Sequence, residues 1–151
     1  MDPTVTAAMI TGFVGLIVGF LPKYLEQSKI NKNRLVVDDK YKGMWKGSSI
    51  RVKEDDSIKY DIEFEFAPKG KELHGTCRIG SGNDWDILEV VGYSRYDRFL
   101  VANYQNTDDL KLQYGSFVAN LSNDGTLEGE YIGFGPQEKT MIQGNFQVNK
   151  I

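Results

Sequence analysis

Apolar and polar residues follow two different patterns in this chain, one before and one after about residue 40. Residues Val5–Leu21 form an apolar run without a charged side chain, in which two threonine hydroxyls are the only polar side-chain groups. At a rise of about 1.5 Å per residue, a helix of this length just crosses a hydrocarbon core of about 30 Å. The run therefore predicts one transmembrane α-helix within residues 1–22.

From Tyr41 onward, apolar and polar residues alternate with a period of two, which is typical of half-buried β-strands. The alternation is clearest in Ser57–Phe66, where apolar residues at even positions from Ile58 alternate with charged residues. Residues 41–151 are therefore predicted to form one all-β domain. The eight predicted strands are Met44–Val52, Ser57–Phe66, Glu72–Ile79, Trp85–Ser94, Phe99–Tyr104, Leu112–Leu121, Leu127–Phe134 and Thr140–Val148.

Eight consecutive short strands, each with one apolar face, predict an antiparallel up-and-down, lipocalin-like barrel. A sandwich of two sheets is the alternative. Glycines recur at predicted inward positions, namely Gly75, Gly129 and Gly144, and allow the sheet to coil tightly. The looser connections follow every second strand and so share one rim, where a ligand would enter. They are Lys53–Asp56, Gly80–Asp84, Gln105–Lys111 and Gly135–Lys139.

Residues 23–40 link the two patterns and are predicted to form a polar helical extension followed by a linker. Four basic residues follow the apolar run and none precedes it, which places the barrel in the cytoplasm by the positive-inside rule. These residues are Lys23, Lys29, Lys32 and Arg34. A cleaved signal peptide is the alternative, but it needs a basic N-terminal region and a small-residue cleavage site, and neither is found here.

Small residues recur four positions apart within the apolar run, as in the pairs Ala8 and Gly12, and Gly15 and Gly19. In lipid, small residues at this spacing let helix backbones approach closely. The pattern predicts that the transmembrane helix forms homo-oligomers. The alternative is that these glycines reflect only the general frequency of glycine in membrane helices.

Composition narrows the classes of function. With 18 basic and 21 acidic residues, the net charge of −3 argues against a DNA or RNA polymer as partner. Cys77 is the only cysteine and His74 the only histidine, which excludes an internal disulfide, a paired-cysteine zinc site and a histidine-rich metal site. Asp55-Asp56 and Asp108-Asp109 lie in predicted turns without metal-ligand spacing. We expect neither an enzyme nor a protein with a metal or cofactor.

Two motifs suggest a family. Gly43-Met44-Trp45 resembles the Gly-x-Trp opening of lipocalin-like barrels, and the stretch from Asp124 to Tyr131 recurs in such small barrels. Together with the N-terminal apolar run, the chain resembles the bacterial CBASS-type antiphage effectors, which join transmembrane segments to a minimal lipocalin-like barrel. The resemblance implies a barrel that binds a cyclic dinucleotide, self-associates and disrupts the bacterial inner membrane. It departs from the best-known members in having one predicted span instead of two.

A cyclic dinucleotide needs cations for its phosphates and flat aromatic surfaces for its bases. Suitable side chains lie near the strand ends of the looser rim, although each also has a purely structural interpretation. Strict alternation turns Arg78 outward, and inward tyrosines are usually core residues. Trp45 is assigned to plugging the closed end. The ligand-binding candidates are Arg51, Tyr60, Arg78, Trp85, Tyr104, Tyr114, Tyr131, Lys139 and Thr140.

Two other functions fit the same predicted architecture. The chain is alternatively a membrane-tethered carrier of an apolar small molecule such as a fatty acid, which requires an apolar cavity. It is alternatively a scaffold protein whose barrel is filled by its own side chains and binds no ligand. The presence or absence of a cavity separates the two.

Overall fold

The computed structural model describes residues 39–52, 57–136 and 139–151. The predicted transmembrane helix, the residues Ala8, Gly12, Gly15 and Gly19, and nearly all of the predicted extension lie outside these described residues. Within the described part of the chain, no helix is long and apolar enough to cross a membrane.

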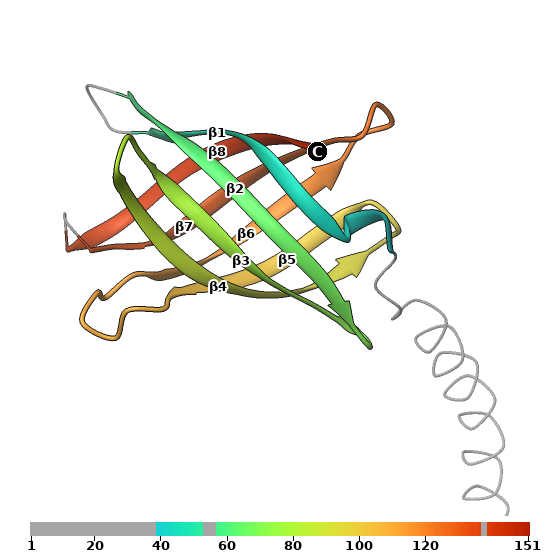
Figure 1. Cartoon of the computed structure of the whole chain (residues 1–151), viewed down its shortest axis with the longest axis horizontal. Helices are drawn as coiled ribbons and strands as arrows, with labels where there is room; N and C mark the ends of the chain where they lie inside the picture. Colours follow the sequence, from blue (N-terminus) through green and yellow to red (C-terminus); the bar gives the residue numbers. More distant parts are fainter. Residues whose placement is uncertain (1–38, 53–56, 137–138) are drawn as a thin grey trace, which may run out of the picture. The chain divides into compact units, whose positions relative to one another are not determined.

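The described residues form one short 3-10 helix and a closed eight-stranded barrel (Figure 1). Each strand pairs antiparallel with its neighbour in sequence, and β1 pairs with β8 to complete the ring. The antiparallel up-and-down barrel predicted from the alternation is confirmed, and the alternative sandwich is wrong. The elements are η1 (Asp39–Tyr41), β1 (Gly43–Val52), β2 (Ser57–Lys69), β3 (Glu72–Ser81), β4 (Asp84–Arg95), β5 (Phe99–Asn106), β6 (Tyr114–Leu121), β7 (Thr126–Gly135) and β8 (Thr140–Lys150).

Several strand boundaries differ from the prediction by one to three residues, and two of these differences have a clear physical reason. Strand β2 continues past Phe66 because the turn at Gly70, with φ of +65°, brings Lys69 opposite Glu72. Strand β6 begins at Tyr114, whereas the predicted strand begins at Leu112. Leu112 lies instead in the β5–β6 loop and is 62% exposed, so its apolar character does not reflect burial.

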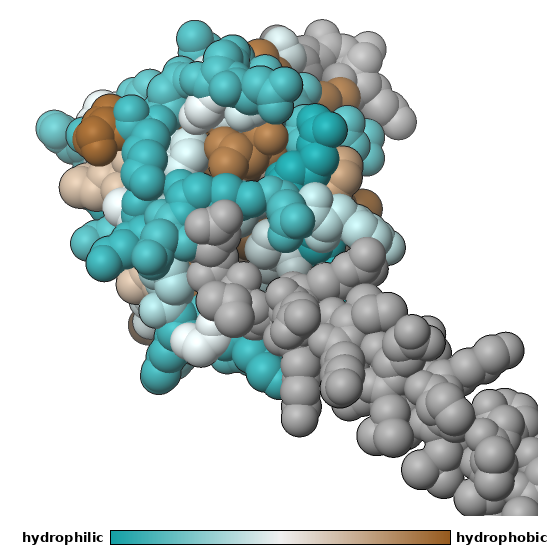
Figure 2. Space-filling view, turned by 90° about the vertical axis from the view of Figure 1, so that its right-hand side faces the viewer, coloured by the Kyte–Doolittle hydropathy of each residue, from teal (hydrophilic) through white to brown (hydrophobic). Residues whose placement is uncertain are grey.

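One end of the barrel is closed by packed side chains. Trp45, near the start of β1, is 1% exposed, and its indole Nε1 donates a hydrogen bond of 2.9 Å to the backbone oxygen of Tyr41. Phe66, Leu73 and Leu127, from three other strands, are buried at the same end. Trp45 therefore plugs the closed end, as predicted. Figure 2 views this end, where hydrophilic residues cover most of the described surface.

The opposite end carries the connections after β1, β3, β5 and β7, as predicted for the looser rim. The connection between β3 and β4 is tighter than expected, because Gly82 adopts a φ of +59° in a short turn. The β5–β6 loop is the longest connection among the described residues, and it folds against β4 through a hydrogen bond of 2.9 Å from Thr107 N to Ile87 O. This end is called the open end below.

Candidate functional site

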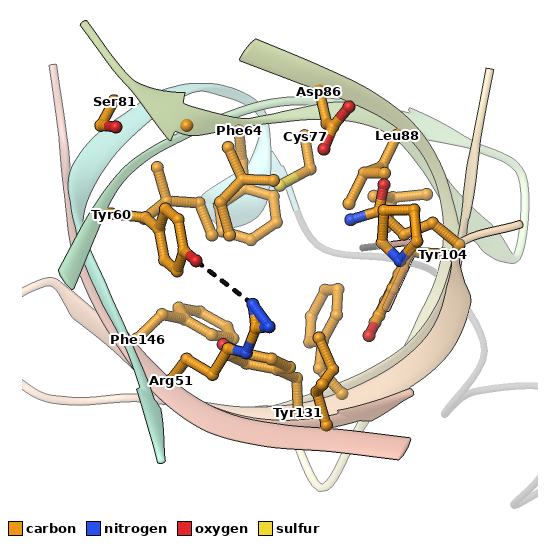
Figure 3. Close-up of a pocket in the computed structure, with 18 of the residues that line it drawn as sticks. Arg51, Tyr60, Phe64, Cys77, Ser81, Asp86, Leu88, Tyr104, Tyr131 and Phe146 are labelled. Carbon is orange, nitrogen blue, oxygen red and sulfur yellow. Dashed lines mark hydrogen bonds between the residues drawn. The ribbon is translucent and has the colours of Figure 1, made fainter. Parts of the chain in front are cut away.

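A cavity of about 120 Å³ lies inside the barrel toward the open end (Figure 3). Its apolar lining residues are Ile62, Phe64, Cys77, Ile79, Leu88, Val90, Phe117, Pro136, Ile142 and Phe146. Its polar lining residues are Arg51, Tyr60, Ser81, Asp84, Asp86, Tyr104, Gln113 and Tyr131, with Gly80 completing the wall. The cavity is smaller than the range of about 300–1,000 Å³ common for ligand pockets, so it suits a compact molecule.

Arg51 places a positive charge inside the cavity. It follows Trp45, Gly47 and Ser49 on the inward face of β1 and is only 5% exposed. Its Nη1 donates a hydrogen bond of 3.2 Å to the hydroxyl of Tyr60 on β2 (Figure 3). Because burying a charge is costly unless polar groups compensate it, an arginine at this position is a marked departure from an apolar core.

Tyr131 and Arg51 lie on either side of Gly144, which has no side chain to keep them apart. Gly144 on β8 is paired with Arg51 of β1 on one side and with Tyr131 of β7 on the other. A Cβ atom at Gly144 would lie 2.4 Å from the Tyr131 hydroxyl and 2.4 Å from the carbonyl oxygen of Ile50. The missing side chain therefore makes room for the Tyr131 phenol. Ser49 Oγ donates to this phenol at the long distance of 3.5 Å.

Burial keeps two phenols and the thiol of the cavity protonated. It raises the pKa of Tyr104 well above its usual value, and it also raises the pKa of Tyr131, against opposing contributions from Ser49 and the Arg51 charge. Both phenols therefore remain neutral hydroxyl donors at neutral pH. Burial likewise raises the pKa of the Cys77 thiol, which makes it a poor nucleophile.

Two carboxylates line the other side of the cavity. Asp84 and Asp86 lie on β4, and Figure 3 shows Asp86 across the cavity from Arg51. Lys111 of the β5–β6 loop holds Asp86 by an ion pair of 2.5 Å between Nζ and Oδ1, and this bond raises the pKa of Lys111. These aspartates are not among the ligand-binding residues predicted from the sequence. Counting back by two from buried Val90 and Leu88 would have identified both.

Three phenylalanine rings form the apolar base of the cavity. Phe64 lies 5.3 Å from Phe146 and 5.7 Å from Phe117 between ring centroids, and Phe117 meets Phe146 edge-on at 5.4 Å. Such tilted and edge-on pairs are favourable arrangements of aromatic rings. The three rings come from β2, β6 and β8, so the base exists only in the closed barrel.

Four of the nine predicted ligand-binding residues line the cavity, namely Arg51, Tyr60, Tyr104 and Tyr131. The other five, Arg78, Trp85, Tyr114, Lys139 and Thr140, are absent from its lining. Lys139 and Thr140 are exposed at the open end.

Arg78, Trp85 and Tyr114 lie on the outer surface because they alternate with inward residues on their strands. Trp85 lies between the cavity residues Asp84 and Asp86, and the Arg78 guanidinium covers its ring at 4.9 Å. Tyr114 is 51% exposed and stacks on Phe134 with 6.0 Å between ring centroids. The structure therefore brings four of the nine predicted side chains together at the cavity and places these three on the outer face.

Comparison with known proteins supports the fold and no more. No family model matches the chain, and no curated protein matches it. A solved structure described as "Structure of EF1p2_mFAP2b bound to DFHBI" is similar, with a TM-score of 0.61 and 8% sequence identity. The similarity covers 78% of this chain and 99% of that one. At this identity the two proteins share the eight-stranded barrel, and the site must be judged from its own residues.

Proposed function

We propose that the barrel binds one compact, mainly apolar molecule in its interior, as a carrier or a sensor. The observation that carries the proposal is an aromatic cavity near the open end that also contains a buried arginine. Small-molecule sites are typically concave and apolar, with a few polar groups that orient the ligand. Arg51, Tyr60 and Tyr131 are such groups, and Phe64, Phe117 and Phe146 supply the apolar surface.

The similar barrel structure supports this proposal indirectly. Its description names a bound molecule, DFHBI, so a barrel of this architecture holds a ligand in that protein. The cavity in the present chain also supports ligand binding, and it argues against a scaffold whose barrel is filled completely. The proposal includes a membrane tether, which is supported by the apolar run Val5–Leu21 and the basic residues that follow it.

A cyclic dinucleotide is the second candidate ligand, as the family resemblance implies, with disruption of the inner membrane as the output. The buried cation beside tyrosine rings favours it, since phosphates and bases need such groups. Size argues against it, because two bases, two sugars and two phosphates exceed a cavity of about 120 Å³. Only one base would enter, and the remainder would lie across the open end.

The test uses a variant that fills the cavity. Ile142 lines the cavity, whereas the next residue back, Met141, is 58% exposed on the outer face. Ile142→Phe should therefore block the site, and Met141→Phe is the matched control with the same added ring. The full-length chain would be purified from its host in detergent, and small molecules released on denaturation would be identified by mass spectrometry.

We expect the wild type and Met141→Phe to release the same compact molecule and Ile142→Phe to release much less. A thermal-shift panel of cyclic di-AMP, cyclic di-GMP and cyclic GMP–AMP runs in parallel. Stabilisation by one of these, lost in Ile142→Phe, would favour the second candidate. If no molecule is released and nothing in the panel stabilises the chain, the ligand-binding proposal fails and the scaffold alternative stands.

A further inference from the structure

The polar groups of the cavity are not evenly distributed. Arg51, Tyr60 and Tyr131 come from β1, β2 and β7, while Asp84 and Asp86 come from β4. Figure 3 shows Asp86 across the cavity from Arg51. The cavity is therefore positive on one wall and acidic on the other. A charged ligand in this cavity is therefore oriented by the electric field between the two walls, and its apolar part contacts the apolar surface.

The positive wall is a built site rather than a solvated charge. Arg51 is 5% exposed, its register partner Gly144 carries no side chain, and Ser49 beside it on the inward face of β1 is fully buried. A planar guanidinium fork matches the two oxygens of a carboxylate better than any other side chain does. Because Arg51 is buried, where the effective dielectric constant is lower than in water, this attraction exceeds its value at the surface.

The neighbouring tyrosines add neutral donors to the same wall. The hydroxyl of Tyr60 accepts from Arg51 and that of Tyr131 accepts from Ser49. A tyrosine oxygen that accepts a hydrogen bond still carries its own O–H group to donate. Since burial raises the pKa of Tyr131, this phenol stays protonated and does not oppose an anion with a charge of its own.

The acidic wall opposes the reverse orientation of an anion. Asp84 and Asp86 would repel a negative group placed near β4. Lys111 partly offsets Asp86 through their ion pair. An anionic ligand is therefore driven toward Arg51, and its apolar part is left against the rings of Phe64, Phe117 and Phe146.

We infer that this cavity selects a planar aromatic anion, such as an aromatic carboxylate, and orients its acidic group toward Arg51. The inference rests on the proposed function and names the chemical class of its ligand. The cavity volume of about 120 Å³ fits a molecule with one ring and a short acidic group. Charge-assisted hydrogen bonds from arginine make the anion bind more tightly than a neutral molecule of the same shape.

The test uses three probes of nearly identical shape, namely benzoate, benzamide and benzamidine, which are anionic, neutral and cationic at neutral pH. Their dissociation constants for the full-length chain in detergent would be measured by NMR titration. We expect benzoate to bind about tenfold more tightly than benzamide, and benzamidine to bind most weakly. Arg51→Met should abolish the preference for benzoate and leave benzamide binding nearly unchanged.

Arg78→Met is the matched control, because it removes the same charge from the outer surface and should preserve the preference. If Arg51→Met does not fold, the ratio between benzoate and benzamide in the wild type still decides the inference. Equal binding of benzoate and benzamide, or tightest binding of benzamidine, would overturn it and leave the proposed function intact. If none of the three probes binds, the inference also fails, and the proposed function is judged separately by the molecule that Ile142→Phe loses.

Discussion

Single residues decide the shape of the cavity, and Gly144 is the clearest case. It lies in one row between Tyr131 and Arg51, and any side chain there would enter the space of the Tyr131 phenol. The absence of one methyl group thus brings a hydroxyl and a guanidinium onto one wall. Neither residue type by itself reveals that they meet.

Gly144→Ala should destabilise the barrel by about 1–3 kcal/mol, the usual cost of overpacking a filled interior. The new Cβ would lie 2.4 Å from the Ile50 carbonyl oxygen, which the paired backbone cannot easily move. Chemical denaturation of the wild type and the variant measures the difference in the free energy of unfolding. Asn145→Ala, at the adjacent exposed position, should change it by less than about 0.5 kcal/mol. Equal stability of Gly144→Ala and the wild type would contradict this account.

The two arginine candidates show how much of the site was predictable. Arg51 follows inward Ser49 at a spacing of two, whereas Arg78 follows inward Cys77 at a spacing of one. Alternation therefore separates a cavity arginine from a surface arginine. The same rule, applied to β4, would have replaced Trp85 by Asp84 and Asp86.

At the scale of strands, the outward residues form a charged ladder. Glu63 on β2 is paired in register with Lys46 on β1 and with Arg78 on β3. Its carboxylate contacts the Lys46 ammonium at 2.9 Å and the Arg78 guanidinium at 3.2 Å. The hydrogen bond from Lys46 is the main cause of the lowered pKa of Glu63. Arg78, predicted as a ligand contact, here links two strands on the outer face.

This ladder predicts a pH-dependent contribution to stability. A carboxyl whose pKa is lowered by folding stabilises the protein fully above its unfolded pKa, near 4.5, and loses that contribution as the pH falls through the folded pKa. Glu63→Gln should therefore lower the free energy of unfolding at pH 7 by up to about 1 kcal/mol, since these are surface ion pairs. The difference should vanish in strong acid, where wild-type Glu63 is itself protonated.

Urea denaturation at neutral and acidic pH measures this dependence. Glu65→Gln, two residues along the same face of β2, controls for the loss of one negative charge. A destabilisation of Glu63→Gln that is the same at both pH values would show that the ladder does not act through charge.

At the scale of the whole molecule, closure of the barrel brings residues from separate hairpins together at the cavity. Seven of the eight strand pairings join neighbours in sequence, and only β1 with β8 joins the two ends of the domain. That one pairing sets Arg51 against Gly144. Closure also removes free strand edges, which are otherwise prone to aggregate.

The proposed membrane tether is the other feature of the whole molecule, and it predicts association between chains. Replacing both Gly15 and Gly19 by leucine should weaken self-association of the full-length chain about tenfold, because close helix packing in lipid needs small residues. Energy transfer between labelled chains in lipid vesicles measures this association. Val14→Leu with Val18→Leu is the matched control at adjacent apolar positions. Equal association of the two double variants would remove the small-residue face from the proposal.

The sequence by itself determined the eight strands, their order and the alternation of inward and outward positions within them. The physical reason is that side chains alternate along a strand, so a period of two is visible without any tertiary contact. It also contained the apolar run Val5–Leu21, whose role as a transmembrane helix remains a prediction.

Only the tertiary structure decided which inward residues meet. Strand register brings Arg51, Gly144 and Tyr131 into one row, and the packing of three distant phenylalanines determines how much space remains. Register and packing depend on residues far apart in the chain, so no local pattern reveals them. For this reason the barrel and its inward positions were predictable, whereas the placement of the arginine and the aspartates on opposite walls of one cavity became visible only in the folded chain.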